Sequence, residues 1–136
     1  MKLDHIVLLV GSLERSLPYY ETLLSAIGFE KSRDHVWGNG DGIYFDFKEA
    51  SEPGDGYRRY GIGLNHLGFT AESKEAVEAV AEAMRSRGFE VPALQRLGDS
   101  WALFMKDPDG MLRDHLSRLS KKGRAQRRPI PTHNGH

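Results

Sequence analysis

The sequence contains no cysteine, which excludes disulfide bonds and thiolate metal ligands. Any bound metal ion would have to be held by nitrogen and oxygen atoms. No apolar run approaches the roughly 20 residues that a membrane-spanning helix needs. The chain also enters a strand-like segment at Leu3 without the long apolar stretch of a signal peptide. We therefore expect a cytoplasmic protein with no membrane partner.

The remaining composition predicts one soluble domain with a short tail. The 136 residues are 39% hydrophobic and 28% charged, a globular balance, and are too few for two independent domains. Five basic and no acidic residues lie in 119–136, leaving 14 basic against 19 acidic residues in the rest. A basic tail could contact nucleic acid. Its prolines favour a solvated, disordered terminus, so we expect a domain over 1–118 and no nucleic-acid partner.

Two halves of the chain carry the same short motifs in the same order. Residues 3–5 (LDH) and 64–66 (LNH) are 61 positions apart, and residues 28–30 and 88–90 (both GFE) are 60 positions apart. A helix-like stretch lies between the two motifs in each half. A duplicated unit of about 60 residues is the economical explanation.

Each unit is predicted to form a strand, a helix and three further strands, over about 3–48 and 64–117. In the first unit, Ser12 caps a helix that Gly28 stops, and strands are expected near 3–10, 30–33, 35–37 and 42–48. Pro18 removes one intrahelical hydrogen bond, which favours a separate first turn and a helix proper from about Leu17. We interpret residues 49–62 as the linker between the units.

The second unit repeats this order. Strands are expected near 64–70, 90–94, 100–106 and 111–117, and Asp107 to Gly110 has the composition of a type I turn between the last two. Ser73 caps the helix, whose expected core stripe is Val77, Val80, Ala81 and Met84.

These motifs together resemble the vicinal-oxygen-chelate superfamily, which contains glyoxalase I, extradiol dioxygenases and antibiotic-resistance proteins. The resemblance rests on residues 3–7 (LDHIV), 13–16 (LERS), 28–29 (GF) and 104–110 (FMKDPDG), and it extends over about 3–117. It implies an α+β fold in which two βαβββ units form a cupped, eight-stranded mixed sheet. Relatives pair two chains, so the resemblance also implies a homodimer.

The repeat predicts a metal site. His5 and His66 occupy equivalent points of equivalent strands, and a pseudo-twofold axis would bring them together; the last strands add Asp46 and Asp114. The resemblance agrees, because relatives place ligands on the first and last strands of each unit. We therefore predict that a divalent ion (Fe, Ni, Zn or Mn) is bound by His5, His66, Asp46 and Asp114, with Asp46 and Asp114 also as catalytic carboxylates.

Two departures qualify the ligand set. Relatives usually carry Glu four residues after the turn glycine, where this chain has Asp114, which is shorter by roughly 1.5 Å. Arg113 and His115 stand where apolar residues are expected, and a bulge in this strand would direct His115 inward in place of Asp114.

Three activities are open to such a site on a small-molecule substrate. Two carboxylates favour lyase- or isomerase-like chemistry of the glyoxalase type, in which one of them acts as a general base. Ligation by Asp114 alone would suit an extradiol-type dioxygenase. A metal-free, bleomycin-resistance-type binding protein is the alternative of another class. Residues 57–60 (YRRY) in the linker either hold an anionic group or form an exposed loop.

Overall fold

The computed structural model describes residues 1–118, and within the last strand, 112–118, it describes the backbone pairing but not the side chains. The predicted tail, 119–136, lies outside the described residues. None of the described helices is long and apolar enough to span a bilayer. The elements are β1 (His5–Val10), α1 (Leu13–Ala26), β2 (Glu30–Arg33), β3 (Val36–Gly38), β4 (Tyr44–Glu49), β5 (His66–Thr70), α2 (Lys74–Ser86), β6 (Gln95–Leu97), β7 (Ser100–Lys106) and β8 (Leu112–Arg118).

The two halves have the same topology, which confirms the α+β class and the two βαβββ units. The first sheet has the order β1-β4-β3-β2 and the second has β5-β8-β7-β6. In each, the first strand pairs in parallel with the last, and the other pairings are antiparallel. The eight strands thus form two four-stranded mixed sheets, and no pairing among the described residues joins them.

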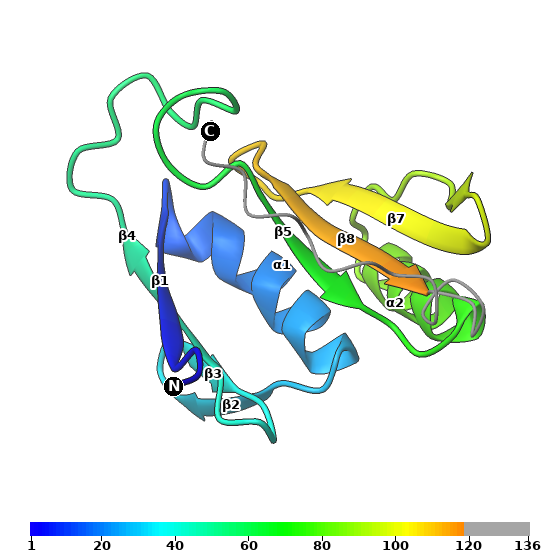
Figure 1. Cartoon of the computed structure of the whole chain (residues 1–136). Coiled ribbons are helices and arrows are strands. Elements are labelled where there is room, and N and C mark those ends of the chain that lie inside the picture. The colour runs from blue at the N-terminus through cyan, green and yellow to red at the C-terminus, as the bar shows by residue number, and fades with distance from the viewer. Residues whose placement is uncertain (119–136) are drawn as a thin grey trace.

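The units are held together through their helices. The helices α1 and α2 contact each other, and Figure 1 shows α1 between β1 of the first sheet and β5 of the second. One continuous apolar cluster contains residues of both units, including Tyr20, Phe47, Met84 and Leu103. The strands β1 and β5 each lie at one edge of their own sheet.

Both helices begin at the predicted serine caps. The Ser12 hydroxyl accepts a hydrogen bond from the Arg15 amide at 3.2 Å, and Ser73 does the same for Ala76 at 3.1 Å. A capping oxygen of this kind satisfies one of the free amides of the first turn. The expected stripe on α2 is buried as predicted, at Val77, Val80, Ala81 and Met84.

The repeated Gly-Phe pair ends both helices. Gly28 and Gly88 have φ of 97° and 85°, a backbone conformation that side-chain-bearing residues avoid. The amides of Phe29 and Phe89 then donate to carbonyls five residues back, at 2.8 and 3.1 Å. This is the Schellman arrangement. The strongest sequence signal for the repeat is therefore a pair of helix stops.

Pro18 lies inside α1, which runs without a break from Leu13 to Ala26, so the prediction of a separate first turn is wrong. The first turn is fixed from outside the helix. Besides the Ser12 cap, the Glu49 carboxylate at the end of β4 accepts a hydrogen bond from the Leu13 amide at 3.1 Å. These contacts offset the intrahelical bond that proline cannot make.

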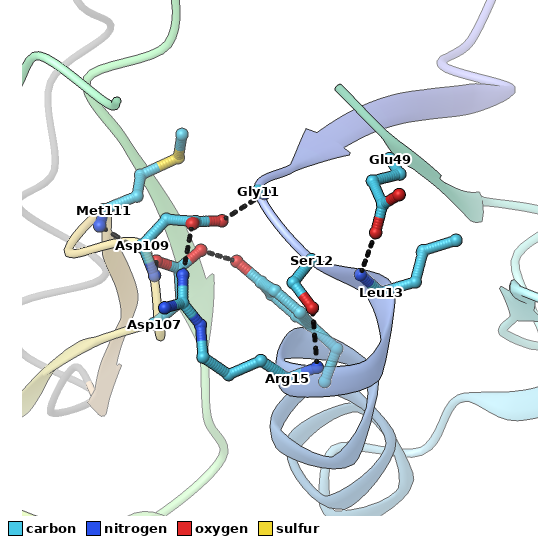
Figure 2. Close-up of polar contacts among 9 residues, drawn as sticks. Gly11, Ser12, Leu13, Arg15, Glu49, Asp107, Asp109 and Met111 are labelled. Atoms are coloured by element: carbon cyan, nitrogen blue, oxygen red, sulfur yellow. Dashed lines mark hydrogen bonds and ion pairs between the residues drawn. The ribbon is translucent and has the colours of Figure 1, made fainter. Parts of the chain in front are cut away.

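The aspartates of the turn between β7 and β8 fasten the second unit to the first. Asp109 accepts hydrogen bonds from the Gly11 amide at 2.9 Å and from the Arg15 guanidinium at 3.0 Å (Figure 2). Asp107 is 6% exposed and accepts a hydrogen bond from the hydroxyl of Tyr20 in α1. It also accepts from the amides of Asp109 and Met111, both at 2.9 Å. The turn is therefore a structural junction between the units.

This junction leaves no room for a side chain at Gly11. A Cβ placed there would lie 2.6 Å from Asp109 Oδ1, whereas a Cβ at Gly40 would meet nothing within 4 Å. We expect Gly11→Ala to lower the free energy of unfolding by about 1 to 3 kcal/mol through overpacking, and Gly40→Ala to change it by less than about 0.5 kcal/mol. Urea unfolding of both variants measures the difference. Equal stability of the two would show that Asp109 does not hold this contact.

Candidate metal centre

His5 and Asp46 lie on the same face of the first sheet. In the parallel pairing of β1 with β4, His5 is opposite Tyr44 and Val7 is opposite Asp46. Leu8, Val10, Phe45 and Phe47 alternate with them and are buried on the helix side. We call the side turned away from the helices the open face. His5 and Asp46 both line a depression there of about 470 Å³, together with Asp4, Ser32, Arg33, Val36 and Tyr44.

The open face beside His5 is partly apolar. Val7 and Leu9, the next two residues of β1 on this side, are 45% and 61% exposed. The Tyr44 ring lies over Gly38, where an added Cβ would meet ring carbon at 2.3 Å. Exposed apolar side chains next to a few polar groups are typical of a surface that binds a ligand or a partner.

The His5 imidazole is oriented by the residue before it. Its Nδ1 lies 2.8 Å from Asp4 Oδ2. A carboxylate accepts hydrogen bonds, so Nδ1 carries the proton in the neutral ring and Nε2 retains its lone pair. Metal-binding histidines commonly use one ring nitrogen for the metal and donate the other N–H to an oxygen acceptor.

His66 shows the same arrangement in the second unit. It is the first residue of β5, it is exposed, and its Nδ1 lies 2.8 Å from Asn65 Oδ1. The sequence reasoning singled out the two histidines but missed Asp4 and Asn65. The signal was present in the repeated motif, because both positions carry a side-chain oxygen directly before the histidine.

Within one chain the two histidines do not share a site. His66 lies in the second sheet and does not line the depression that contains His5 and Asp46. Across the described part of the chain, no three His, Asp or Glu side chains lie close enough to hold a metal ion. The structure therefore brings His5 together with Asp46, and it does not bring His66 to them.

Asp114 lies in an irregular part of β8. On β5, His66 and Gly68 pair with Leu112 and His115, so three steps along β8 match two steps along β5. The pairing of β7 with β8 shifts in the same place, between Met105 and Leu103. Asp114 falls inside both shifts, whereas His115 is in register with Gly68. Ligation by Asp114, or by His115 in its place, stays a prediction.

A larger cavity lies elsewhere, between the two units. It has a volume of about 730 Å³ and includes Ile27 and Phe29 at the end of α1 and Leu67 and Phe69 of β5. None of His5, His66 and Asp46 lines it. His5 and Asp46 therefore lie on the open face of the first sheet, on the other side of β1 and β4 from this cavity.

Comparison with known proteins agrees with the fold. Residues 2–113 match the family model of the Glyoxalase/Bleomycin resistance protein/Dioxygenase superfamily. The chain is 34% identical over 119 residues to the uncharacterized protein YqjT of Bacillus subtilis (strain 168), covering 79% of this chain and 91% of that protein.

Two solved structures show the same fold at low identity. The glyoxylase/bleomycin resistance protein/dioxygenase domain from Frankia sp. EAN1pec has a TM-score of 0.70 at 21% identity, over 88% of this chain and 98% of that one. The genomically encoded fosfomycin resistance protein FosX from Listeria monocytogenes has a TM-score of 0.65 at 18% identity, over 91% and 98%. With two βαβββ units and a family match over nearly all the described residues, the chain belongs to the glyoxalase/bleomycin resistance protein/dioxygenase superfamily.

Proposed function

We propose that this protein is a metal-dependent enzyme that acts on a small molecule with two neighbouring oxygen atoms, by lyase- or isomerase-like chemistry. The observation that carries the proposal is that both histidines make the same contact through Nδ1. In each unit, Nδ1 is engaged by the preceding side chain at 2.8 Å, which leaves Nε2 available as a ligand. Strand packing does not explain why His5 and His66 are oriented in the same way, because both side chains are exposed.

The donor set fits a first-row divalent ion. Neutral imidazole nitrogens and carboxylate oxygens suit Fe, Mn, Ni and Zn, and thiolates are absent from the sequence. We propose that His5 and Asp46 supply the ligands of the first unit, and that His66 and Asp114 supply those of the second. A metal bound there would act as a Lewis acid that stabilises negative charge on the two substrate oxygens.

The side chains around it have separate tasks. Asp46 or Asp114 would act as a general base that removes a proton from a carbon next to a substrate carbonyl. Val7, Leu9 and Tyr44 would contact the apolar part of the substrate and keep water from the reacting carbon. We favour this chemistry over the dioxygenase type because the last strand of each unit carries a carboxylate, Asp46 in the first and Asp114 in the second.

A complete site requires a second chain in this proposal. His5 and His66 lie in separate sheets, and exposed Val7 and Leu9 lie on the open face beside His5. We propose a homodimer in which the first unit of one protomer faces the second unit of its partner. This pairing would cover the apolar open face and bring the two halves of the ligand set together, giving two sites related by the dimer axis.

A metal-free binding protein is the second candidate. It is favoured by the partly apolar depression around His5 and Tyr44. Such a protein would sequester a small ligand between the same two open faces without chemical change.

Metal content separates these classes. Protein purified without chelator or nickel affinity resin is analysed for metals, before and after reconstitution with Fe(II), Mn(II), Ni(II) and Zn(II). About one ion per chain is the expected result. Retention of nickel or zinc would direct assays to isomerase and lyase substrates, and retention of iron to catechols with dioxygen. A chain that binds none of the four ions after reconstitution would refute the enzyme proposal and favour the binding protein.

A further inference from the structure

We propose that Asp4 and Asn65 are positioning residues that fix the tautomer of His5 and His66, and that the linker between the units orients Asn65 for this task. The proposal deepens the proposed function, because it concerns how the two histidines are prepared for a metal. The tautomer itself can be measured in metal-free protein.

The orientation of the Asn65 amide is set by a second contact. Its Nδ2 donates a hydrogen bond to the backbone carbonyl of Arg59 at 2.7 Å. A carbonyl oxygen can only accept, so the atom that faces it must be the amide nitrogen. The amide oxygen is therefore the atom 2.8 Å from His66 Nδ1. Since that oxygen cannot donate, Nδ1 of His66 must carry the hydrogen, and Nε2 keeps its lone pair.

The linker is tied to the same point of β5. The Tyr57 hydroxyl lies 2.7 Å from the Leu64 carbonyl oxygen and 2.8 Å from that of Asn65, and the two oxygens share its one donor hydrogen. These contacts hold the end of the linker against the residues directly before His66. The position of Asn65, and through it the His66 ring, thus depends on the fold of residues 57–65.

The basic residues of this linker have partners within it. The Arg58 guanidinium pairs with Asp55 at 3.2 Å, and the Arg59 guanidinium lies 5.3 Å from the centre of the Tyr60 ring. Residues 58–60 are exposed in the structure, and in this proposal the loop serves to position His66. The interpretation that residues 57–60 hold an anionic group stays a prediction. The part of Arg59 that serves this role is its backbone carbonyl.

In the first unit, the Asp4 carboxylate alone has the role that the Asn65 amide and the linker have in the second unit. Asp4 Oδ2 faces His5 Nδ1 at 2.8 Å, and either carboxylate oxygen can only accept. The side chains of His5 and Asp4 are 57% and 81% exposed, so their contact adds little stability. The consequence of the contact is the ring orientation and the tautomer. Outer contacts of this kind typically change metal affinity by about 10- to 100-fold.

Histidine tautomers in metal-free protein provide the direct test. Two-bond ¹⁵N–¹H correlation spectra are recorded at about pH 8, where an ordinary histidine is neutral. We expect both His5 and His66 to be protonated on Nδ1. Asp4→Leu and Asn65→Leu, which have no acceptor, are expected to shift the adjacent histidine towards the Nε2–H form. Asp4→Asn and Asn65→Asp are the matched controls, since each retains an oxygen acceptor and should retain the Nδ1–H form.

Zinc titration of the wild type and the same four variants tests whether the histidine tautomer affects metal binding. Each Leu variant is expected to bind zinc about 10- to 100-fold more weakly than wild type, and each matched control within a few-fold of it. Wild-type histidines in the Nε2–H form, or Leu variants with unchanged tautomers, would overturn the positioning role. Zinc binding that is unaffected in the Leu variants would also overturn it, although the metal site would stand. Wild-type Nδ1–H tautomers with no zinc uptake would support the positioning role and refute the proposed function.

Discussion

Replacing His5 with alanine is expected to weaken the binding of a divalent metal by more than about 100-fold, because loss of a ligand should exceed the effect of losing an outer contact. Asp46 would be left as the remaining ligand on the open face of the first sheet. The measurement is a competition titration with a coloured zinc chelator. His66→Ala should give a loss of similar size, since the repeat makes the two positions equivalent.

The matched control is His35→Asn. His35 is exposed in the turn between β2 and β3 and has φ of 65°, a conformation that Asn tolerates better than most residues. This variant should bind metal as wild type does. If His5→Ala and His35→Asn bound metal equally well, His5 would not be a ligand, and the repeat would have a structural meaning only.

Asp107→Ala is expected to lower the free energy of unfolding by about 3 kcal/mol. The variant would remove the acceptor of three hydrogen bonds and leave the hydroxyl of Tyr20, which is 2% exposed, without this partner. A buried donor that loses its acceptor costs about 1 to 3 kcal/mol, and the two turn amides add to it. The midpoint of urea unfolding is the observable, and the slope should stay constant.

Asp34→Ala serves as the control for Asp107→Ala. Asp34 is 91% exposed and makes one long ion pair, at 3.5 Å to Lys31, so its loss should change stability by less than about 0.5 kcal/mol. A double-mutant cycle of Asp107→Ala with Tyr20→Phe isolates the contact between the units, with an expected coupling of at least about 1 kcal/mol. Additive effects in that cycle would show that the contact does not join the units energetically.

The secondary structure was largely predictable because its signals are local. Ser12 and Ser73 act on the amides of the turn that follows them, and Gly28 and Gly88 have the positive φ that ends a helix. The least accurate prediction concerns the first hairpin strand of the second unit. It was expected near 90–94 and is found at Gln95–Leu97, an exposed edge strand of three residues. A short edge strand has little alternating burial to mark it.

The arrangement of the two units was not predictable from local pattern. The expected cupped sheet is found as two four-stranded sheets whose units meet through the contact of α1 with α2, and this packing involves residues far apart in the sequence. The contacts of Asp109 with Gly11 and Arg15 span 98 and 94 residues. The motif that helped to identify the family is thus a junction whose partners no local pattern indicates.

The candidate site was predictable in composition but not in assembly. His5 and His66 are each the first residue of the first strand of their unit, as the repeat indicates, and Asp46 lies on the same face of the first sheet as His5. Whether the ligands of the first unit lie close to those of the second depends on how whole units pack. The spacing of motifs along the sequence does not determine that packing. The anticipated irregularity in the last strand is present as a register shift that contains Asp114.

The central claim is that one metal site is shared by the first unit of one protomer and the second unit of its partner. The most direct test is the metal content of heterodimers formed from a His5→Ala chain and a His66→Ala chain, each with a different affinity tag. Neither homodimer has an intact site, whereas the heterodimer has one site with both histidines and one with neither. The account predicts empty homodimers and a heterodimer that binds one metal ion. Heterodimers as empty as the homodimers would contradict it and place both histidines of a site in one chain.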